Sequence, residues 1–237
     1  MKKITIILCI VLALLVGNSY VLYEVSGSRS FQFFGELVTK IETSEKVVAL
    51  TFDDGPGINT DEILHMLQTH DVKGTFYLTG SEIEEDFEKA VRIVKHGHEI
   101  GNHTYSHPRM VLKSPSFITE EIKETDKLIR EIGYEGDIHF RPPYGKRLFI
   151  LPYYLSSNDR KTILWDIEPE TYPEIAASSD KITKHVVENV EPGSIILLHV
   201  MYESRRESLD AVAPIITALK DEGYTFVTVS QLLEYEE

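Results

Sequence analysis

The sequence predicts an α/β protein with about seven parallel strands that form a (β/α) barrel, complete or incomplete. Short apolar runs alternate along the chain with amphipathic stretches of helical period, which is typical of βαβ units. Polar residues of unusual type follow several of the apolar runs. The chain has 237 residues, of which 42% are hydrophobic, and this suits one domain with a sizeable core. A doubly wound open sheet is the alternative arrangement.

The elements are assigned from apolar period and from the residues at their ends. The predicted strands are Val47–Phe52, Gly74–Leu78, Glu99–Asn102, Ile138–Arg141, Thr162–Ile167, Ser194–His199 and Thr225–Val229. The predicted helices are Asp61–Thr69, Glu82–Lys95, Thr119–Ile132, Lys181–Val190 and Ser208–Asp221. Acidic residues open the first two helices, and Gly97 and Gly133 end the second and third. The acidic run Glu82–Asp86 is interpreted as a solvated helix face, and Phe149–Asn158 has no firm assignment.

The first segment differs from the rest of the chain. Two lysines precede a nearly unbroken apolar run over Ile4–Val16, and no lysine follows it closely. Residues 1–23 therefore predict a signal peptide or an uncleaved signal anchor, of which the anchor is favoured. The charge asymmetry places the globular part outside the cytoplasm, anchored to the membrane or secreted to the cell wall. Residues 24–45 are interpreted as a stalk or linker, and residues 46–237 as the catalytic domain.

Composition excludes some classes of function. The net charge of −14 and the lack of a basic stripe argue against a nucleic-acid partner. The only cysteine is Cys9, inside the apolar run, so the exported part has neither a disulfide nor a thiol nucleophile. We expect a monomer.

Chemically active side chains follow the apolar runs, and in parallel α/β folds such strand ends gather at one edge of the sheet. Asp53 and Asp54 close the first of these runs, and His103 and His107 follow the third. One carboxylate and two imidazoles form a metal site with open positions, as in a catalytic zinc centre. The second carboxylate is then free to act as a base.

Four motifs carry a resemblance to a known family. They are Thr51-Phe52-Asp53-Asp54-Gly55, His103-Thr104-Tyr105-Ser106-His107, Arg141-Pro142-Pro143-Tyr144 and Leu197-Leu198-His199. In this order they resemble motifs of the polysaccharide deacetylases of carbohydrate esterase family 4, also called NodB-homology domains. The resemblance extends from about Lys46 to the C-terminus and implies a distorted (β/α) barrel.

The resemblance implies a role for each motif. Asp54, His103 and His107 would hold a divalent metal, with Zn²⁺ favoured over Co²⁺ or Ni²⁺. Asp53 would be the general base that deprotonates the attacking water, and Arg141 would orient it and lower its pKa.

The remaining family motifs supply an acid, an oxyanion donor and contacts to the substrate. By resemblance His199 would protonate the leaving nitrogen, and the backbone N–H of Tyr144 would stabilise the oxyanion. Leu197 would line the pocket for the acetyl methyl group. Trp165 is a candidate for stacking on a sugar ring.

One motif departs from the family pattern. Where the family has Trp-x-x-Asp-Pro-x-Asp-Trp, this chain reads Trp165-Asp166-Ile167-Glu168-Pro169-Glu170-Thr171. With one residue fewer between the two acids, Glu168 and Glu170 replace the two aspartates, and Thr171 replaces the second tryptophan. An acid here is expected to raise the pKa of His199. A glutamate reaches about one methylene further, so we expect the pairing to survive with changed geometry.

These residues predict a metal-dependent hydrolase that removes N-acetyl groups from N-acetylglucosamine units of an extracellular polysaccharide, with peptidoglycan favoured by location. An O-acetyl esterase acting on xylan-like polymers is one alternative. A glycan-binding pseudoenzyme, suggested by the altered motif, is another.

Overall fold

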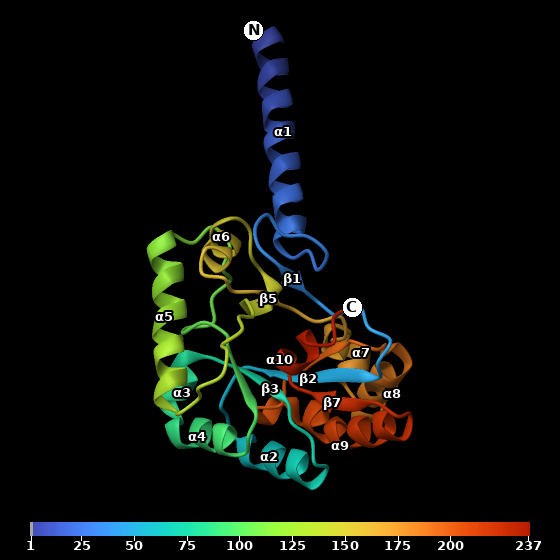
Figure 1. The fold of residues 1–237 in the computed structure, drawn as a ribbon. Helices are drawn as coiled ribbons and strands as arrows, with labels where there is room; N and C mark the ends of the chain where they lie inside the picture. Colours follow the sequence, from blue (N-terminus) through green and yellow to red (C-terminus); the bar gives the residue numbers. More distant parts are fainter. Residues whose placement is uncertain (1) are drawn as a thin grey trace.

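The computed structural model describes residues 2–237 and consists of a globular domain with one helix projecting from it (Figure 1). The projecting helix is α1 (Lys2–Ser26), and its stretch Lys3–Ser26 is long and apolar enough to cross a membrane. The strands are β1 (Leu37–Val38), β2 (Val47–Asp53), β3 (Thr75–Leu78), β4 (Glu99–Asn102), β5 (Thr162–Ile163), β6 (Ile195–Leu198) and β7 (Thr225–Val227). The helices of the domain are α2 (Thr60–Thr69), α3 (Gly80–Glu85), α4 (Phe87–Lys95), α5 (Pro115–Glu131), α6 (Ile150–Ser156), α7 (Pro173–Ala176), α8 (Ser179–Asn189), α9 (Arg206–Asp221) and α10 (Val229–Leu233).

The sheet is parallel and does not close. Strands β4, β3, β2 and β6 lie in that order, and β7 also pairs with β2. Strands β1 and β5 form a separate parallel pair. Phe140 bridges β4 and β5, whereas Ile167, four residues beyond the end of β5, forms a single bridge to β6. The predicted incomplete barrel of parallel strands is therefore confirmed.

Strand β2 is the centre of the sheet, and all seven of its residues are buried. Val48, Leu50 and Phe52 pack into the larger apolar core, which includes residues of α2, α4 and α9. Val47 and Ala49 belong to a second cluster, with Ile195 and Leu197 of β6. A strand buried on both faces reads as an unbroken apolar run, which explains why β2 is so clear in the sequence.

Several elements differ from the prediction for identifiable physical reasons. The predicted strand Ile138–Arg141 forms only a bridge at Phe140, because the prolines that follow Arg141 have no N–H to continue the ladder. The strand predicted over Thr162–Ile167 ends at Ile163. The predicted helix Glu82–Lys95 is divided at Asp86, whose backbone is not helical. The unassigned stretch Phe149–Asn158 contains α6.

Residues 24–45, interpreted from sequence as a stalk, contribute to the domain itself. Leu37 and Val38 pair with β5, and the N–H of Ile41 donates to the carbonyl of Gly193 over 3.1 Å. Val38 and Ile41 are buried in the same cluster as Val47. A two-residue strand has no apolar period that the sequence could reveal, so this packing was not predictable from pattern alone.

This packing predicts an effect on stability. Ile41→Ala is expected to lower the free energy of unfolding by about 2–5 kcal/mol, because it removes a buried side chain and leaves a cavity. Ile58→Ala is the control, since Ile58 is 68% exposed and Ile41 only 1%. Chemical denaturation of the full chain in detergent micelles measures both. Equal, negligible effects would mean that residues 24–45 are a stalk after all.

Candidate active site

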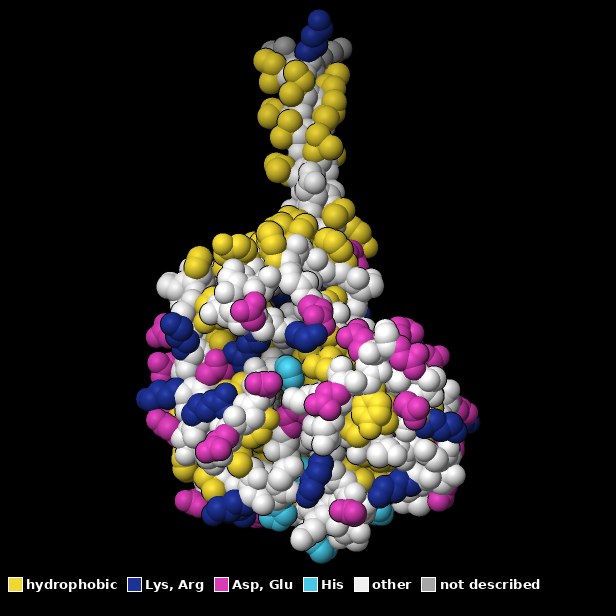
Figure 2. Space-filling view, viewed as in Figure 1, with side chains coloured by type: hydrophobic (Ala, Val, Ile, Leu, Met, Phe, Trp, Pro, Cys, Tyr) yellow, Lys and Arg dark blue, Asp and Glu magenta, His cyan; other side chains and the backbone are white. Residues whose placement is uncertain are grey.

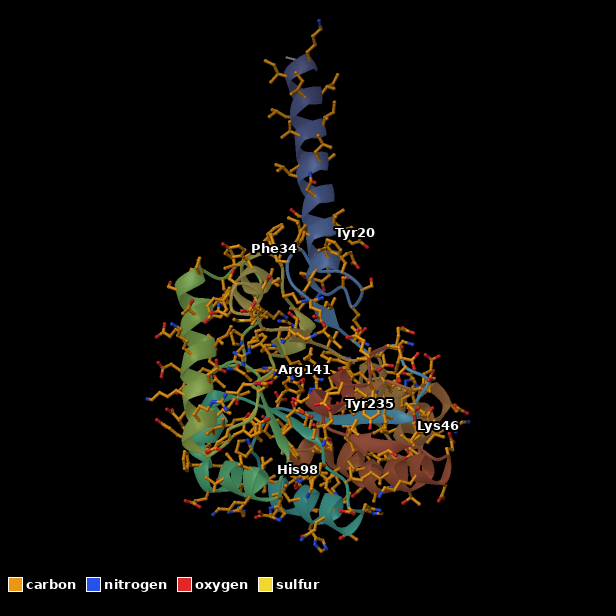
Figure 3. All side chains as sticks on the ribbon, in the orientation of Figure 1. Tyr20, Phe34, Lys46, His98, Arg141 and Tyr235 are labelled. Atoms are coloured by element: carbon orange, nitrogen blue, oxygen red, sulfur yellow. The ribbon has the colours of Figure 1, made fainter. Side chains whose placement is uncertain are left out.

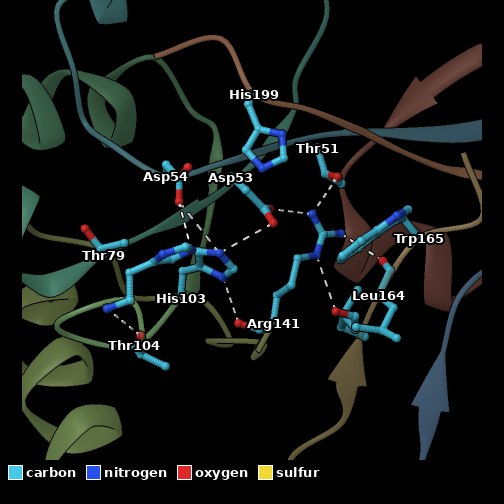
Figure 4. A network of polar contacts seen from close by, with 12 residues as sticks. Thr51, Asp53, Asp54, Thr79, His103, Thr104, Arg141, Leu164, Trp165 and His199 are labelled. Carbon is cyan, nitrogen blue, oxygen red and sulfur yellow. Dashed lines mark hydrogen bonds and ion pairs between the residues drawn. The ribbon is translucent and has the colours of Figure 1, made fainter. Parts of the chain in front are cut away.

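Two adjacent aspartates share one site because the backbone turns between them (Figure 4). Asp53 is the last residue of β2 and is buried. Asp54 has a φ of 69°, in the left-handed region, which turns its side chain toward the same site. The turn is held by Glu82 of α3, whose carboxylate accepts from the N–H of Gly55 (2.7 Å) and the hydroxyl of Thr79 (2.6 Å).

The two histidines lie on a compact loop after β4. Thr104 and His107 have φ values of 70° and 54°, so this segment is not helical. The buried carboxylate of Glu121, on α5, accepts from the N–H groups of Tyr105 (2.9 Å) and Ser106 (2.8 Å). The loop is therefore held by a side chain from another element.

Asp54, His103 and His107 bring three metal-binding atoms together, all within 4.8 Å of one another. Asp54 Oδ1 lies 3.3 Å from His107 Nε2 and 3.8 Å from His103 Nε2. Two ligands of one tetrahedral zinc lie about 3.3 Å apart when each bond is about 2.0–2.1 Å. These separations therefore fit a single divalent ion.

The protonation of the two rings also fits a metal. His103 Nδ1 is 2.8 Å from the carbonyl oxygen of Arg141, which can only accept, so Nδ1 carries the proton and Nε2 keeps its lone pair. Burial lowers the pKa of His107, which keeps this imidazole neutral. Neutral imidazoles and a carboxylate are a donor set that suits zinc, cobalt or nickel.

Arg141 is fully buried in the middle of the domain (Figure 3), and its guanidinium is satisfied by four acceptors. Nη1 donates to Asp53 Oδ1 (2.6 Å) and to the hydroxyl of Thr51 (2.8 Å). Nη2 and Nε donate to the carbonyl oxygens of Leu164 (2.9 Å) and Ile163 (3.3 Å). These two carbonyls bind the guanidinium at the point where β5 ends.

The pairing decides the charge of Asp53. Burial on its own raises the pKa of this carboxyl, but neighbouring positive charge, above all that of Arg141, outweighs it and holds the pKa below its usual range. Asp53 Oδ1 is occupied by Arg141, while Oδ2 lies 3.6 Å from His103 Nε2. Asp53 is therefore an ionised carboxylate whose second oxygen lies beside the candidate metal ligands.

His199 follows β6 and pairs with Glu170. Its Nδ1 bonds to Glu170 Oε2, and its backbone N–H donates to the same carboxylate (3.0 Å to Oε1). The hydroxyl of Ser208, on α9, also donates to Glu170 Oε1. Burial lowers the pKa of His199, but the bond to Glu170 outweighs it and raises the pKa to about 9. With Nδ1 committed to Glu170, the proton available for transfer is the one on Nε2.

Glu168 lies near His199 in sequence but has different partners. Its Oε2 accepts from the indole N–H of Trp165 (2.9 Å), the hydroxyl of Thr171 (2.7 Å) and the guanidinium of Arg29 (2.7 Å). Of the two glutamates expected to tune His199, only Glu170 therefore contacts it. Glu168 instead fixes the orientation of Trp165.

All the predicted site residues except two line one cavity of about 330 Å³. Its lining includes Leu197, Trp165 and Tyr144, together with the exposed Arg205. Arg141 and Glu170 do not line it, because they stand behind Asp53 and His199. Tyr144 has a φ of 58° and exposes its ring at the rim. The N–H groups of the next two residues bond within the turn, whereas the N–H of Tyr144 has no acceptor among residues 2–237.

Sequence reasoning missed four residues that shape this site: Glu82, Glu121, Ser208 and Arg29. Glu82 was interpreted as part of a solvated face, yet it holds the turn after Asp54. The spacing Thr79-x-x-Glu82 is that of a capping box, which was the available signal for it. The other three act across long sequence separations, and no local pattern identifies them.

A parallel α/β domain with a three-ligand cluster, an ion-paired carboxylate and a histidine–glutamate pair in one cavity is typical of metal-dependent hydrolases. Residues 40–161 match the sequence model of the family described as Polysaccharide deacetylase. The chain belongs to this family, carbohydrate esterase family 4, whose deacetylases are metal-dependent.

Individual relatives are similar over most of this chain. The peptidoglycan-N-acetylmuramic acid deacetylase PdaC of Bacillus subtilis is 37% identical over 82% of this chain, which spans 40% of that protein. A peptidoglycan-N-acetylglucosamine deacetylase of Bacillus cereus is 32% identical over 85% of this chain and 95% of its own length. The crystal structure of a peptidoglycan N-acetylglucosamine deacetylase has a TM-score of 0.78 and 32% identity, covering 84% and 94% of the two chains.

The matches also include proteins named for other activities. One is a bifunctional xylanase/deacetylase of Pseudobutyrivibrio xylanivorans, 34% identical over 81% of this chain and 31% of its own length. Another is the structure of a family pseudoenzyme from Bacillus anthracis, with a TM-score of 0.75, 27% identity, and coverage of 84% and 69% of the two chains.

The geometry predicts different metal contents for two aspartate variants. Asp54→Ala should lose the bound metal, because it removes one of three ligands. Asp53→Asn should keep it, because Asp53 is held by Arg141 outside the ligand cluster. Metal content after dialysis, measured by mass spectrometry, tests both. Equal loss in the two variants would show that both carboxylates are ligands.

The two glutamates predict different effects on the titration of His199. Glu170→Gln should lower the pKa of His199 from about 9, because it removes the charged hydrogen-bond partner and leaves burial opposed only by the charges of Asp53 and Asp54. Glu168→Gln, the matched control, should leave it unchanged. The raised pKa contributes stability that is fully present below pH 6.5 and is lost as the pH rises through about 9. NMR of histidine-labelled protein follows the titration; equal shifts in both variants would contradict the assignment.

Proposed function

We propose that this chain is a metal-dependent deacetylase that removes N-acetyl groups from amino sugars of peptidoglycan outside the cytoplasmic membrane. One observation carries the proposal. An ionised carboxylate and a protonated histidine, each locked by a buried partner, line the same cavity as the three metal-binding groups. The peptidoglycan deacetylases among the relatives support the choice of substrate.

Asp53 is the base in this proposal. It takes a proton from the water that attacks the acetamide carbonyl, and a new C–O bond forms. Arg141 holds Asp53 Oδ1 and leaves Oδ2 beside the ligand cluster, where the proton is transferred. A carboxylate with a lowered pKa stays ionised at neutral pH and is ready to accept this proton.

His199 is the acid. It gives the Nε2 proton to the amide nitrogen as the C–N bond breaks, so that acetate and a free amine leave. A pKa of about 9 keeps this proton in place at neutral pH. The N–H of Tyr144 offers a hydrogen bond to the oxyanion, and Leu197 packs against the acetyl methyl group. Trp165, oriented by Glu168, forms part of the cavity wall that contacts the sugar.

Asp54, His103 and His107 would hold the metal, for which we propose zinc, with cobalt and nickel as substitutes. When bound, such an ion polarises the acetyl carbonyl and lowers the pKa of a water molecule.

Helix α1 is proposed to anchor the chain in the membrane. Lys2 and Lys3 precede its apolar part, and the next basic residue along the chain is Arg29. This asymmetry directs the domain to the outer face, where the cell wall lies. We expect the anchored protein to act as a monomer.

Two alternatives have specific support. The xylanase/deacetylase relative supports an O-acetyl esterase, since the same site would cleave an ester. The pseudoenzyme among the structural matches supports a glycan-binding role. The intact pairing of Asp53 with Arg141 and of His199 with Glu170 favours catalysis over binding alone.

Acetate release tests the proposal. Zinc-loaded full chain in detergent is expected to release acetate from peptidoglycan and to stop when a chelator removes the metal. Asp53→Asn should lose about 10²–10⁴-fold in rate, as expected for a missing general base. Faster release from acetylxylan than from any N-acetylated glycan would favour the esterase. Glycan binding without release by the metal-loaded protein would favour the pseudoenzyme.

A further inference from the structure

Helix α1 is only just long enough to span a bilayer. Its 25 residues measure about 37 Å at 1.5 Å per residue, and a bilayer's hydrocarbon core is about 30 Å thick. With its N-terminal lysines at the inner face, Tyr20 and Tyr23 reach the outer interface, where aromatic residues are enriched. Ser26 is already buried in the domain, and Val25 is half-buried. No residues are left over to hold the domain away from the membrane.

The foot of α1 is attached to the domain by Arg147. The N–H of Arg147 donates to the carbonyl of Ser26 (2.9 Å). Its buried guanidinium donates to the carbonyls of Ser28 (2.6 Å), Phe31 (3.2 Å) and Gly145 (2.9 Å). The chain that leaves α1 is therefore fixed on the domain, and the position of α1 determines which face meets the membrane.

That face is apolar. Six large side chains around the foot of α1 are between 39% and 60% exposed, and we call them the aromatic collar: Phe31, Phe33, Phe34, Phe149, Ile150 and Tyr153. Two pairs of these rings are in contact. The ring centroids are 4.4 Å apart for Phe33–Phe149 and 5.5 Å apart for Phe34–Tyr153. Figure 2 shows hydrophobic side chains gathered on the domain beneath α1, and Figure 3 places Phe34 beside the foot of the helix. Soluble surfaces rarely expose so many large apolar groups together.

A cavity of about 520 Å³ beside the foot of α1 adds positive charge to this face. Leu22 of α1 and Leu112, which is 85% exposed, form part of its wall. Arg109 and Lys146 also line it, and no acidic residue does. Within residues 2–237 neither cation has an ion-pair partner; each instead lies over a tyrosine ring. In a chain of net charge −14, two unpaired cations at the bilayer level match lipid phosphates.

We propose that the aromatic collar, Leu112 and the Arg109–Lys146 pair dock the domain on the outer leaflet of the bilayer that α1 spans. The apolar side chains enter the interface between headgroups and acyl chains, and the two cations face lipid phosphates. This proposal rests on the proposed membrane anchor, not on the deacetylase activity. The partner is the bilayer and not a second copy of the chain, because the collar surrounds the foot of the only candidate membrane helix in residues 2–237.

Docking would hold the catalytic cavity close to the membrane. Tyr144 lines both the catalytic cavity and the cavity at the foot of α1. The turn that contains Tyr144 thus separates the acetyl-binding site from the lipid surface. A domain held in this way meets glycan strands near the membrane before those further out in the wall.

Spin labels on the full chain test the docking. The chain is reconstituted, one copy per nanodisc, in a bilayer containing phosphatidylglycerol. A nitroxide on the native Cys9 reports whether α1 spans the bilayer. In a Cys9→Ser background, single cysteines replace Phe34, Leu112 and Tyr153, with Gln68 and Phe87 as exposed controls on α2 and α4, away from α1 (Figure 1). Accessibility to oxygen and to a water-soluble nickel chelate is measured at each position.

Labels at 34, 112 and 153 should be accessible to oxygen and protected from the nickel chelate, whereas labels at 68 and 87 should show the reverse. Equal nickel accessibility at all five positions would overturn the docking. Protection of 34, 112 and 153 from both reagents would also overturn it, since a protein then covers the collar. A Cys9 label exposed to nickel would refute the anchor and with it the docking, and would leave the deacetylase proposal untouched. Arg109→Glu with Lys146→Glu should raise nickel accessibility at 112.

Discussion

The ion pair between Arg141 and Asp53 is the interaction on which the rest of the site depends. A buried guanidinium is tolerated only when its charge is paired and its donors are satisfied. Here one planar group bonds β2 through Asp53 and Thr51 and the end of β5 through two carbonyls. The carbonyl of the same residue fixes the tautomer of His103. Removing either partner would leave a buried charge, a loss of about 3–5 kcal/mol for pairs of this kind.

A second buried pair complements the first. Arg141 keeps Asp53 ionised, whereas Glu170 keeps His199 protonated, so a base and an acid coexist at neutral pH in one cavity. Each is locked by a partner that does not line the cavity. The longer reach of glutamate therefore does not disrupt the pairing, because Glu170 still meets His199 and its backbone N–H. The altered motif thus preserves the acid while freeing Glu168 to orient Trp165.

The sequence predicted the parts of the site that the geometry of parallel strands dictates. Buried strands are apolar on both faces, so β2 and β6 were visible, and their polar ends had to converge. The turn at Gly55 allowed Asp53 and Asp54 to share a site. The sequence did not decide between Glu168 and Glu170, because two residues in a tight turn point in directions that only the turn determines. Glu121 and Ser208 act from α5 and α9, and no spacing rule relates them to the site.

The segment between the apolar helix and β2 had no local pattern, yet it connects α1 to residues that line the catalytic cavity. Arg29 bonds Glu168, which in turn orients Trp165, and the Arg29 guanidinium lies 5.0 Å from the centre of the indole ring. Arg147 ties the same segment to the Tyr144–Gly145 turn. Residues that leave α1 thus support the wall of the catalytic cavity through Glu168 and Trp165. A domain boundary at residue 46 would remove β1, the buried Ile41 and Arg29 together, and would leave Trp165 without one of its supports.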